Sequence, residues 1–283
     1  MAVISGDTLD GVSATTLWTL HNRGTEAKRP DGVIRDPWAA TLFDTIEYDY
    51  RKFGKPNQSH GLRAAAFDGV MREHLTAHPK ASVVALAEGL QTSFWRLDEA
   101  GVADELIWYS IDLPPVMALR EQLLPHDDRI VPLAQSALDR SWMDRVAGAA
   151  APATSDTGSN GVFITAEGLM MYLEPDDALA LIRDCAARFP GGRMMFDSIP
   201  PFFSRRTLKG HKLSHRYTAP RMPFGMTPDE ALALADTVPG VRSARDIKLP
   251  PGRGLFKVAA WPPLDRGFLR RVRPSITLLE FDR

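Results

Sequence analysis

From Ala81 onward the chain alternates short apolar runs with helical patterns, and this alternation limits its possible folds more than any other feature. The apolar runs cover residues 82–87, 105–111, 129–134, 161–166, 193–199 and 254–261, and helical patterns cover 92–100, 115–124, 141–147 and 175–189. A strand that is apolar throughout is typical of a parallel sheet with helices on both faces. The sequence therefore predicts an α/β protein with a doubly wound, mostly parallel sheet.

The first eighty residues lack this alternation and show helical patterns instead. In the stretch "RDPWAATL", Asp36 stands where a helix N-cap is expected, and Pro37 follows at the first helical position, where proline's missing N–H costs nothing. We expect a single domain over residues 1–283. Its parts are a helical N-terminal cap (1–80), a sheet core (81–199), a lid-like insertion (200–226) and a C-terminal part of the sheet (227–283).

Charge and composition exclude several classes of protein. The net charge of -1 gives no general attraction to nucleic acid or to anionic membranes. One cysteine, Cys185, excludes an internal disulfide and suits a reducing compartment. No apolar run approaches the ~20 residues of a membrane helix, and the N-terminus lacks the pattern of a signal peptide. We expect a cytoplasmic protein without a membrane partner.

The first apolar run leads into a loop with a single glycine, in the stretch "VVALAEGLQTSFWRL" from Val83 to Leu97. Ligands of doubly wound folds bind outside the carboxyl ends of the strands, so this loop is a candidate binding site. The next run ends at Asp112, which follows Gly89 at about the 20-residue spacing of a carboxylate that binds ribose hydroxyls. Taken alone, the same residues are also compatible with a buried strand and an aspartate that caps a helix.

Four motifs in a fixed order resemble one enzyme family. They are "RDPWAATL", "LAEGLQTSFWRLD", "IDLPPVMALREQLLP" and "AEGLMMYL". Together they resemble the S-adenosylmethionine-dependent methyltransferases related to leucine carboxyl methyltransferase, which include O-methyltransferases of polyketide biosynthesis. The resemblance implies a class I, Rossmann-like methyltransferase fold with N-terminal helices and a lid-like insertion. It also implies S-adenosylmethionine as cofactor, S-adenosylhomocysteine as product and a small molecule as methyl acceptor.

The resemblance also implies roles for particular residues. Arg63 matches the arginine that pairs with the methionyl carboxylate of the cofactor, and Arg23 is a second candidate cation. Asp112 would bind the ribose hydroxyls, with Leu113 beside it. The remaining cofactor contacts implied are the loop residues Ala87, Glu88 and Gly89, the residues Ser136 and Ala137 near adenine, and Glu167 between cofactor and acceptor.

The glycine loop departs from the family pattern at Ala87, where the family has a second glycine. An alanine at positive φ costs on the order of 1 kcal/mol, so Ala87 either has a negative φ or makes the loop slightly strained. The neighbouring Glu88 could favour the sulfonium and ammonium charges of the cofactor, or point to solvent.

The acceptor oxygen belongs to a carboxylate or a hydroxyl group. A carboxylate needs no base, and Arg205 or Arg216 could orient it, whereas a hydroxyl needs a general base. The catalytic candidates, His211, His215 and Tyr217, lie in the insertion. That insertion is either a lid, in which Phe202, Phe203 and Tyr217 exclude water, or a solvated, charged hairpin.

Two other functions and a metal site are weighed against this interpretation. A cofactor-binding scaffold with a decayed site would explain Ala87, and a nicotinamide-dependent dehydrogenase would need a fuller glycine fingerprint. His74 and His78 have the spacing of two metal ligands on one helix. No suitably spaced third ligand accompanies them, so we favour a solvated helix face and expect no metal.

Overall fold

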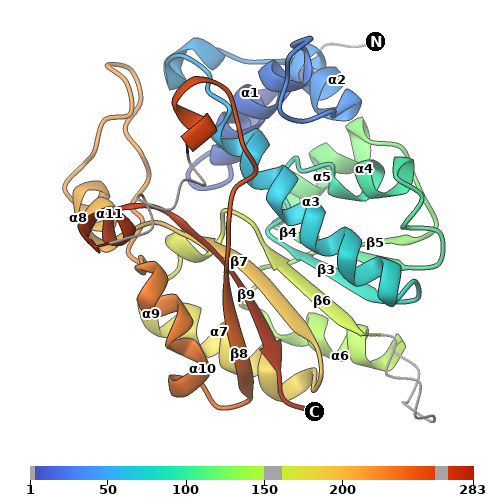
Figure 1. Ribbon diagram of the computed structural model, residues 1–283. Coiled ribbons are helices and arrows are strands. Elements are labelled where there is room, and N and C mark those ends of the chain that lie inside the picture. The colour runs from blue at the N-terminus through green and yellow to red at the C-terminus, as the bar shows by residue number, and fades with distance from the viewer. Residues whose placement is uncertain (1–3, 150–160, 259–266) are drawn as a thin grey trace.

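A seven-stranded sheet forms the centre of the computed structural model, which describes residues 4–149, 161–258 and 267–283. Its strands lie in the order β5-β4-β3-β6-β7-β9-β8 (Figure 1). They are β3 (Ser82–Leu86), β4 (Ile107–Asp112), β5 (Ile130–Ala134), β6 (Val162–Ala166), β7 (Arg193–Ser198), β8 (Val241–Ile247) and β9 (Ser275–Phe281). The first five strands in this order, from β5 across to β7, pair in parallel, whereas β9 is antiparallel to both of its neighbours, β7 and β8. The predicted α/β class with a mostly parallel sheet is confirmed.

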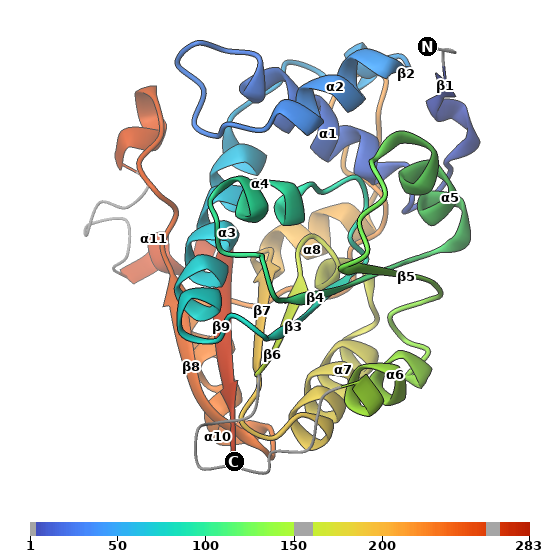
Figure 2. The ribbon, with the colours of Figure 1, turned by 90° about the vertical axis from the view of Figure 1, so that its right-hand side faces the viewer.

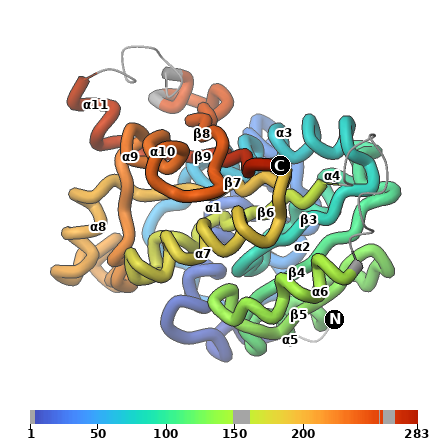
Figure 3. Tube along the Cα trace, turned by 90° about the horizontal axis from the view of Figure 1, so that it is seen from below, coloured from blue at the N-terminus to red at the C-terminus, as the bar shows by residue number. Residues whose placement is uncertain are grey.

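Helices cover both faces of this sheet, as Figures 2 and 3 show from two directions. One face packs against α3 (Ser59–Ala77) and α4 (Ser93–Glu99). The other packs against α6 (Ser141–Ala149), α7 (Pro175–Arg188), α9 (Pro228–Leu232) and α10 (Leu234–Thr237). Helix α5 (Pro114–Leu123) follows β4 and contributes to the packing of the N-terminal helices. Within the described ranges, none of the helices has both the length and the apolar character that crossing a bilayer requires.

Strand β3 shows why the apolar runs predicted the strands correctly. All of its residues are buried, with Val83 and Ala85 in the core below α3 and α4. The intervening residues Val84 and Leu86 belong to the core on the α6–α7 side. Because both faces of the strand are covered, neither face needs polar side chains, and the sequence reads as a continuous apolar run.

One apolar run in the C-terminal part of the chain was predicted wrongly as a strand. The run at 254–261 is not a strand: Gly254–Val258 form the 3-10 helix η4, and residues 259–261 lie outside the described residues. The loop before η4 instead attaches to α3, because Gln58 donates a hydrogen bond to the Arg253 carbonyl and accepts one from its N–H. The two strands that complete the sheet are β8 and β9. β8 is an edge strand with charged side chains, so it lacks the apolar run of a central strand.

The N-terminal cap lies above the sheet in Figure 1. It contains α1 (Thr15–Ala27), α2 (Pro37–Thr45), the 3-10 helices η1 (Gly6–Thr8) and η2 (Tyr50–Phe53), and the short parallel strands β1 (Ile4–Ser5) and β2 (Ile46–Glu47). The predicted start of α2 is confirmed: the side chain of Asp36 accepts a hydrogen bond from the Ala39 N–H at 2.9 Å, and Pro37 opens the helix.

The insertion begins with α8 (Pro201–Leu208) and then rests against the cap. Residues Lys212 and Thr218 form an isolated antiparallel bridge. Between them, Ser214 donates a hydrogen bond to the Lys52 carbonyl, and Arg216 pairs with Asp49. The charged segment is therefore anchored to η2. After the gap in the described residues, α11 (Gly267–Val272) leads into β9.

Candidate active site

A cavity of about 1190 Å³ lies at the carboxyl ends of β3, β4, β5, β6 and β7, and α1, α3, the insertion and the C-terminal region around η4, α11 and β9 contribute to its lining. The chain order reverses between β3 and β6, so this is the topological switch point where doubly wound folds bind ligands. All ten residues predicted to contact a cofactor line the cavity, namely Arg23, Arg63, Ala87, Glu88, Gly89, Asp112, Leu113, Ser136, Ala137 and Glu167.

The glycine loop after β3 approaches α1 so closely that only glycine fits at position 89. Gly89 has φ +60°, and a Cβ there would lie 2.5 Å from Oγ1 of Thr16. The same Thr16 oxygen accepts a hydrogen bond from the Leu90 N–H at 2.7 Å. Ala87 has φ +50° and is the single non-glycine residue with positive φ among the described residues. The loop is therefore strained at Ala87 by on the order of 1 kcal/mol.

Two buried arginines fix the carbonyl groups of this loop. Arg120 of α5 donates to the Gly89 carbonyl at 2.7 Å and to the Gln91 carbonyl at 2.8 Å. Arg23 of α1 donates to the Leu90 carbonyl at 2.5 Å. With its carbonyls directed at guanidinium groups, the loop keeps its shape without the second glycine.

Glu88 does not point to solvent, and its carboxylate is paired with a buried arginine. Its side chain is buried, forms an ion pair with Arg120 at 2.9 Å, and accepts hydrogen bonds from Trp108 Nε1 and Ser110 Oγ. Burial raises the pKa of Glu88, while Arg120 acts in the opposite direction. Because Arg120 also binds the loop carbonyls, Glu88 supports the loop through that arginine and does not point to solvent.

A chain of buried ion pairs lies beneath the loop. Arg23 pairs with Asp36 at 3.0 Å, Asp36 pairs with Arg96 at 2.6 Å, and Arg96 pairs with Asp68 at 2.6 Å. Burial alone would raise the pKa of Asp36, but the two arginines lower it below its ordinary value. The N-cap of α2 is thereby connected to the cofactor side of the cavity, and Arg23 is already compensated by a carboxylate.

Asp112, at the end of β4, faces the loop across the cavity wall. Its carboxylate accepts hydrogen bonds from the Gly89 N–H at 2.6 Å and the Leu113 N–H at 2.7 Å. Burial raises its pKa, and the two N–H groups oppose that shift. Two N–H donors leave acceptor capacity on the carboxylate, so it can also bind hydroxyl groups.

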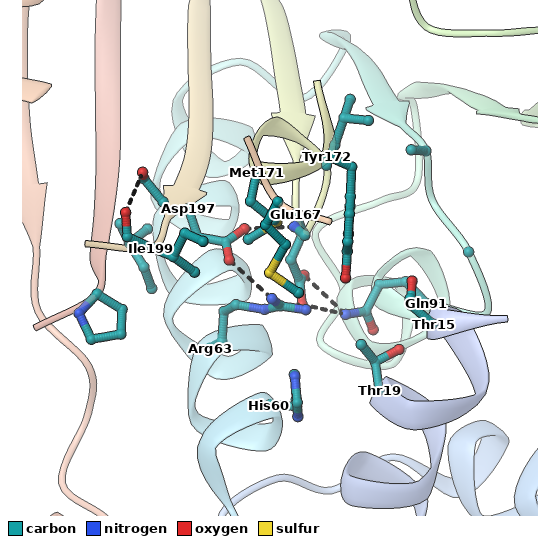
Figure 4. Close-up of a pocket in the computed structure, with 18 of the residues that line it drawn as sticks. Thr15, Thr19, His60, Arg63, Gln91, Glu167, Met171, Tyr172, Asp197 and Ile199 are labelled. Atoms are coloured by element: carbon teal, nitrogen blue, oxygen red, sulfur yellow. Dashed lines mark hydrogen bonds and ion pairs between the residues drawn. The ribbon is translucent and has the colours of Figure 1, made fainter. Parts of the chain in front are cut away.

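Arg63 of α3 lies between two carboxylates at the ends of β6 and β7 (Figure 4). Its Nε is 2.9 Å from Glu167, and its Nη1 is 2.9 Å from Asp197. Burial lowers the pKa of Arg63, but the combined effect of Asp197 and Glu167 is larger and raises the pKa above its ordinary value, so the guanidinium stays charged. Gln91 also donates to Glu167 at 2.9 Å, which connects this ion-pair group to the glycine loop.

Apolar side chains line the cavity beyond Arg63. We call this group the apolar chamber: Trp18, Met171, Tyr172, Ile199, Phe203 and Met222. At the opposite end, Ser136 and Ala137 follow β5, and the Ser136 hydroxyl accepts a hydrogen bond from the Leu138 N–H at 3.1 Å. One end of the cavity is thus polar and built on the loops after β3 and β4, whereas the other is apolar.

The catalytic candidates of the insertion do not lie at the cavity. His211, His215 and Tyr217 are absent from its lining among the described residues, and only Phe203 of the proposed lid aromatics contributes. His211 packs on Phe203, and Tyr217 packs edge-on against Phe53 of the cap. The contacts with η2 turn this segment toward the cap, so the structure gives it no base beside an acceptor.

Sequence reasoning missed several residues at the cavity. Asp197 is the second-last residue of β7, much as Asp112 is the last residue of β4, so an acid near a strand end was visible in "RMMFDSI". His60 lines the cavity from α3, but in the sequence it belongs to a polar connection without a motif. The role of Arg120 depends on contacts with residues about 30 positions away, which no local pattern indicates.

The donor set fits a sulfonium nucleoside. Asp112 offers a carboxylate for ribose hydroxyls, and Arg63 offers a planar cation for an α-carboxylate. Glu167 and Asp197 outnumber Arg63, so their surplus negative charge favours a sulfonium and an ammonium group nearby. The cavity also exceeds the ~300–1000 Å³ of a typical single-ligand pocket, which leaves room for a second molecule. Among the described residues no group of three or more potential metal ligands is present.

Comparisons with known proteins agree with this geometry. The family model for leucine carboxyl methyltransferase matches residues 16–186. The tetracenomycin polyketide synthesis O-methyltransferase TcmP of Streptomyces glaucescens is 29% identical over 269 residues, covering 94% of this chain and 88% of its own length. The S-adenosyl-L-methionine-dependent methyltransferase dpfgK of Gibberella zeae is 24% identical and covers 69% of this chain and 71% of its own.

A solved structure supports the fold. A protein from Thermobifida fusca assigned as a methyltransferase superposes with a TM-score of 0.53 at 14% identity, covering 96% of this chain and 97% of its own. The predicted family, fold and cofactor are therefore confirmed, and neither a decayed scaffold nor a dehydrogenase is supported. This chain belongs to the leucine carboxyl methyltransferase family and is an S-adenosylmethionine-dependent methyltransferase.

Proposed function

We propose that the protein transfers a methyl group from S-adenosylmethionine to an oxygen atom of a small organic molecule. The observation that carries this proposal is that Arg63 and Asp112 line one continuous cavity, on either side of the glycine loop, which also contains an apolar chamber. In this proposal Asp112 binds the ribose hydroxyls and Arg63 the methionyl carboxylate. Gly89, Leu113, Ser136 and Ala137 surround the rest of the nucleoside.

The side chains of the apolar chamber limit which acceptor molecules can bind. Its walls are aromatic rings and methionine side chains, which suit a flat, largely apolar molecule with few polar groups. TcmP is named for tetracenomycin polyketide synthesis, and this supports a polyketide-like acceptor for this chain. The acceptor oxygen belongs to a carboxylate or a hydroxyl group.

The protein's contribution is mainly one of position. When bound, S-adenosylmethionine supplies an already activated methyl group. The chamber residues must then hold the acceptor oxygen in line with the bond that breaks, an orientation effect worth ~7 kcal/mol or more. Phe203 and Met222 reach the chamber from the insertion, which supports a lid role for residues 200–226. The near-zero net charge speaks against a nucleic-acid acceptor, and a cytoplasmic location remains a prediction.

Isothermal titration with S-adenosylmethionine and S-adenosylhomocysteine tests the proposal. We expect micromolar binding of both ligands to the wild type and none to Arg63→Ala. Arg205→Ala is the matched control, because Arg205 is exposed on α8 and does not line the cavity. Thermal unfolding of each variant shows whether loss of binding reflects loss of the fold. Absence of binding to the wild type, or full binding to Arg63→Ala, would contradict the proposal.

A further inference from the structure

His60 lies at the border of the apolar chamber, one helical turn before Arg63 on α3 (Figure 4). Its ring packs edge-on against Trp18, with centroids 5.2 Å apart, and its Nδ1 lies 2.8 Å from Nδ2 of Asn22. No role in the methyltransferase described above requires this histidine. Its hydrogen bonds, however, determine which of its two nitrogens carries a proton.

The orientation of the Asn22 amide is fixed by the backbone around it. Its Oδ1 accepts a hydrogen bond from the Asn57 N–H at 2.7 Å, and its Nδ2 lies 3.2 Å from the Trp18 carbonyl. A flipped amide would direct Nδ2 at the Asn57 N–H and Oδ1 at the Trp18 carbonyl, so both bonds would be lost. Nδ2 is therefore the donor to His60, and Nδ1 of His60 is the acceptor.

An imidazole whose Nδ1 accepts a hydrogen bond carries its proton on Nε2. The charged groups that act on His60 are Arg63 on its own helix and Arg23 on α1, both cations. Burial and then these two arginines hold the pKa of His60 well below its ordinary value. The nearby carboxylates Glu167 and Asp197 are bound to Arg63. The ring is therefore neutral at physiological pH.

The Nε2 atom is accessible from the cavity. His60 is half-buried and lines the cavity, and Nε2 is not among the buried side-chain atoms without a partner. Within the described ranges, none of the hydrogen bonds found involves this nitrogen. His60 thus presents one N–H donor, and no free lone pair, to a chamber that is otherwise mostly apolar.

We propose that His60 donates a hydrogen bond from Nε2 to an oxygen atom of the methyl acceptor, and that Asn22 is a positioning residue that keeps the ring in this tautomer. In this role His60 orients the acceptor and does not remove its proton, since its only lone pair is occupied by Asn22. The proposal rests on the proposed function, because it assumes an acceptor in the chamber.

Long-range ¹H–¹⁵N spectra of the histidine rings test the tautomer without any substrate. The signals of His60 are assigned by their loss in His60→Gln. We expect a neutral ring protonated on Nε2 from about pH 5.5 to 8, the range in which an ordinary histidine changes its charge. In Asn22→Asp the side chain is a carboxylate, which accepts a hydrogen bond from a protonated Nδ1 and favours the charged ring, so His60 should become doubly protonated at neutral pH. A wild-type ring protonated on Nδ1, or one that titrates near 6.5, would overturn the proposal.

Fragment binding in the presence of S-adenosylhomocysteine tests the contact itself. The probes are benzoate and phenol, with toluene as the apolar counterpart. We expect the two oxygen-bearing probes, and not toluene, to shift the His60 Nε2 signal. Their affinity should fall about tenfold in His60→Leu and be partly restored in His60→Gln, which again offers an N–H donor. The matched control is His126→Leu, which makes the same change at an exposed histidine.

Binding of S-adenosylhomocysteine distinguishes a failure of the proposed function from a failure of the role of His60. If the wild type does not bind S-adenosylhomocysteine, the proposed function fails, whatever the tautomer of His60. If wild type and His60→Leu bind S-adenosylhomocysteine with equal affinity, the cofactor site is intact in both. In that case, unchanged probe affinity in His60→Leu, or no effect of the probes on the wild-type His60 signal, overturns the role of His60 alone.

Discussion

The two ends of the cavity are held together by different kinds of interaction. At the loop end, Arg23, Arg120 and Asp112 hold the backbone through buried ion pairs and hydrogen bonds. At the chamber end the walls are apolar side chains that pack against each other. The loop end lies wholly within the part that matches the family, residues 16–186, whereas Ile199, Phe203 and Met222 of the chamber lie beyond it.

This difference reflects the two molecules that the cavity has to hold. A methyl donor with a carboxylate, an ammonium group and ribose hydroxyls is the same in every member of the family, and it demands polar groups at fixed positions. An apolar wall can change one side chain at a time at moderate cost, because volume and shape are what it recognises. The loop end is therefore confined to the part of the chain that matches the family, whereas the chamber combines residues of that part with Ile199, Phe203 and Met222 from beyond it.

The largest expected effect lies beneath the loop end. Asp36→Ala would leave Arg23 and Arg96 buried without the carboxylate between them, so we expect the free energy of unfolding to fall by about 3–5 kcal/mol. Urea denaturation measures this change. Asp44→Ala removes the partner of Lys28 in an exposed pair and should cost less than about 1 kcal/mol. Equal losses in the two variants would show that the buried ion pairs do not distinguish the loop end.

The second effect concerns cofactor binding and its dependence on pH. Asp112→Asn should weaken S-adenosylhomocysteine binding about 10- to 100-fold, because hydrogen bonds to a charged acceptor are lost. Burial raises the pKa of Asp112. As the pH falls, this carboxyl therefore becomes protonated at a pH above the ordinary aspartate pKa, which is near 3.9. Wild-type affinity should therefore decrease as the pH falls through this raised pKa, and the decrease should be smaller in Asp112→Asn. Titrations at several pH values distinguish the two proteins, and an identical pH profile would argue against Asp112 as a ligand.

A third change tests whether the chamber is independent of the loop end. Met171 is buried and lines the chamber, so Met171→Ala should lower the free energy of unfolding by about 2 kcal/mol. Because the chamber shares no ion pair with the glycine loop, binding of S-adenosylhomocysteine should stay within about twofold of the wild type. Calorimetric titration after the stability measurement decides the point. A loss of affinity as large as that of Asp112→Asn would mean that the two ends are not separable.

The same contrast explains how far the sequence predicted the structure. The strands β3 to β7 and the residues that follow them could be predicted, because buried parallel strands are apolar runs and their carboxyl ends meet at one edge. Arg63 depended on the resemblance, since nothing in its own helix indicates a ligand. Strand β8 was missed because an edge strand with one exposed face has no apolar run.

The contacts that the sequence could not predict join residues far apart in the chain. Glu88 was assigned to the cofactor or the solvent, whereas it pairs with Arg120 on another helix. Likewise His60 and Asn22 lie on different helices, and neither stands in a recognisable motif. His211 and His215 were candidates only because they follow a strand of the active-site rim. Packing against η2, which local patterns do not encode, turned their segment elsewhere.

The smallest effect separates the two conformational demands of the glycine loop. Ala87 has φ +50°, so Ala87→Gly should remove the cost of a left-handed alanine and stabilise the protein by about 1 kcal/mol. The opposite change, Gly89→Ala, introduces a Cβ 2.5 Å from Thr16 Oγ1 and should destabilise the protein and weaken S-adenosylhomocysteine binding. Thermal unfolding with and without the ligand measures both. If Ala87→Gly is neutral or destabilising, the added freedom of the unfolded chain equals or outweighs the strain that is relieved, and the left-handed alanine carries no net cost in this loop.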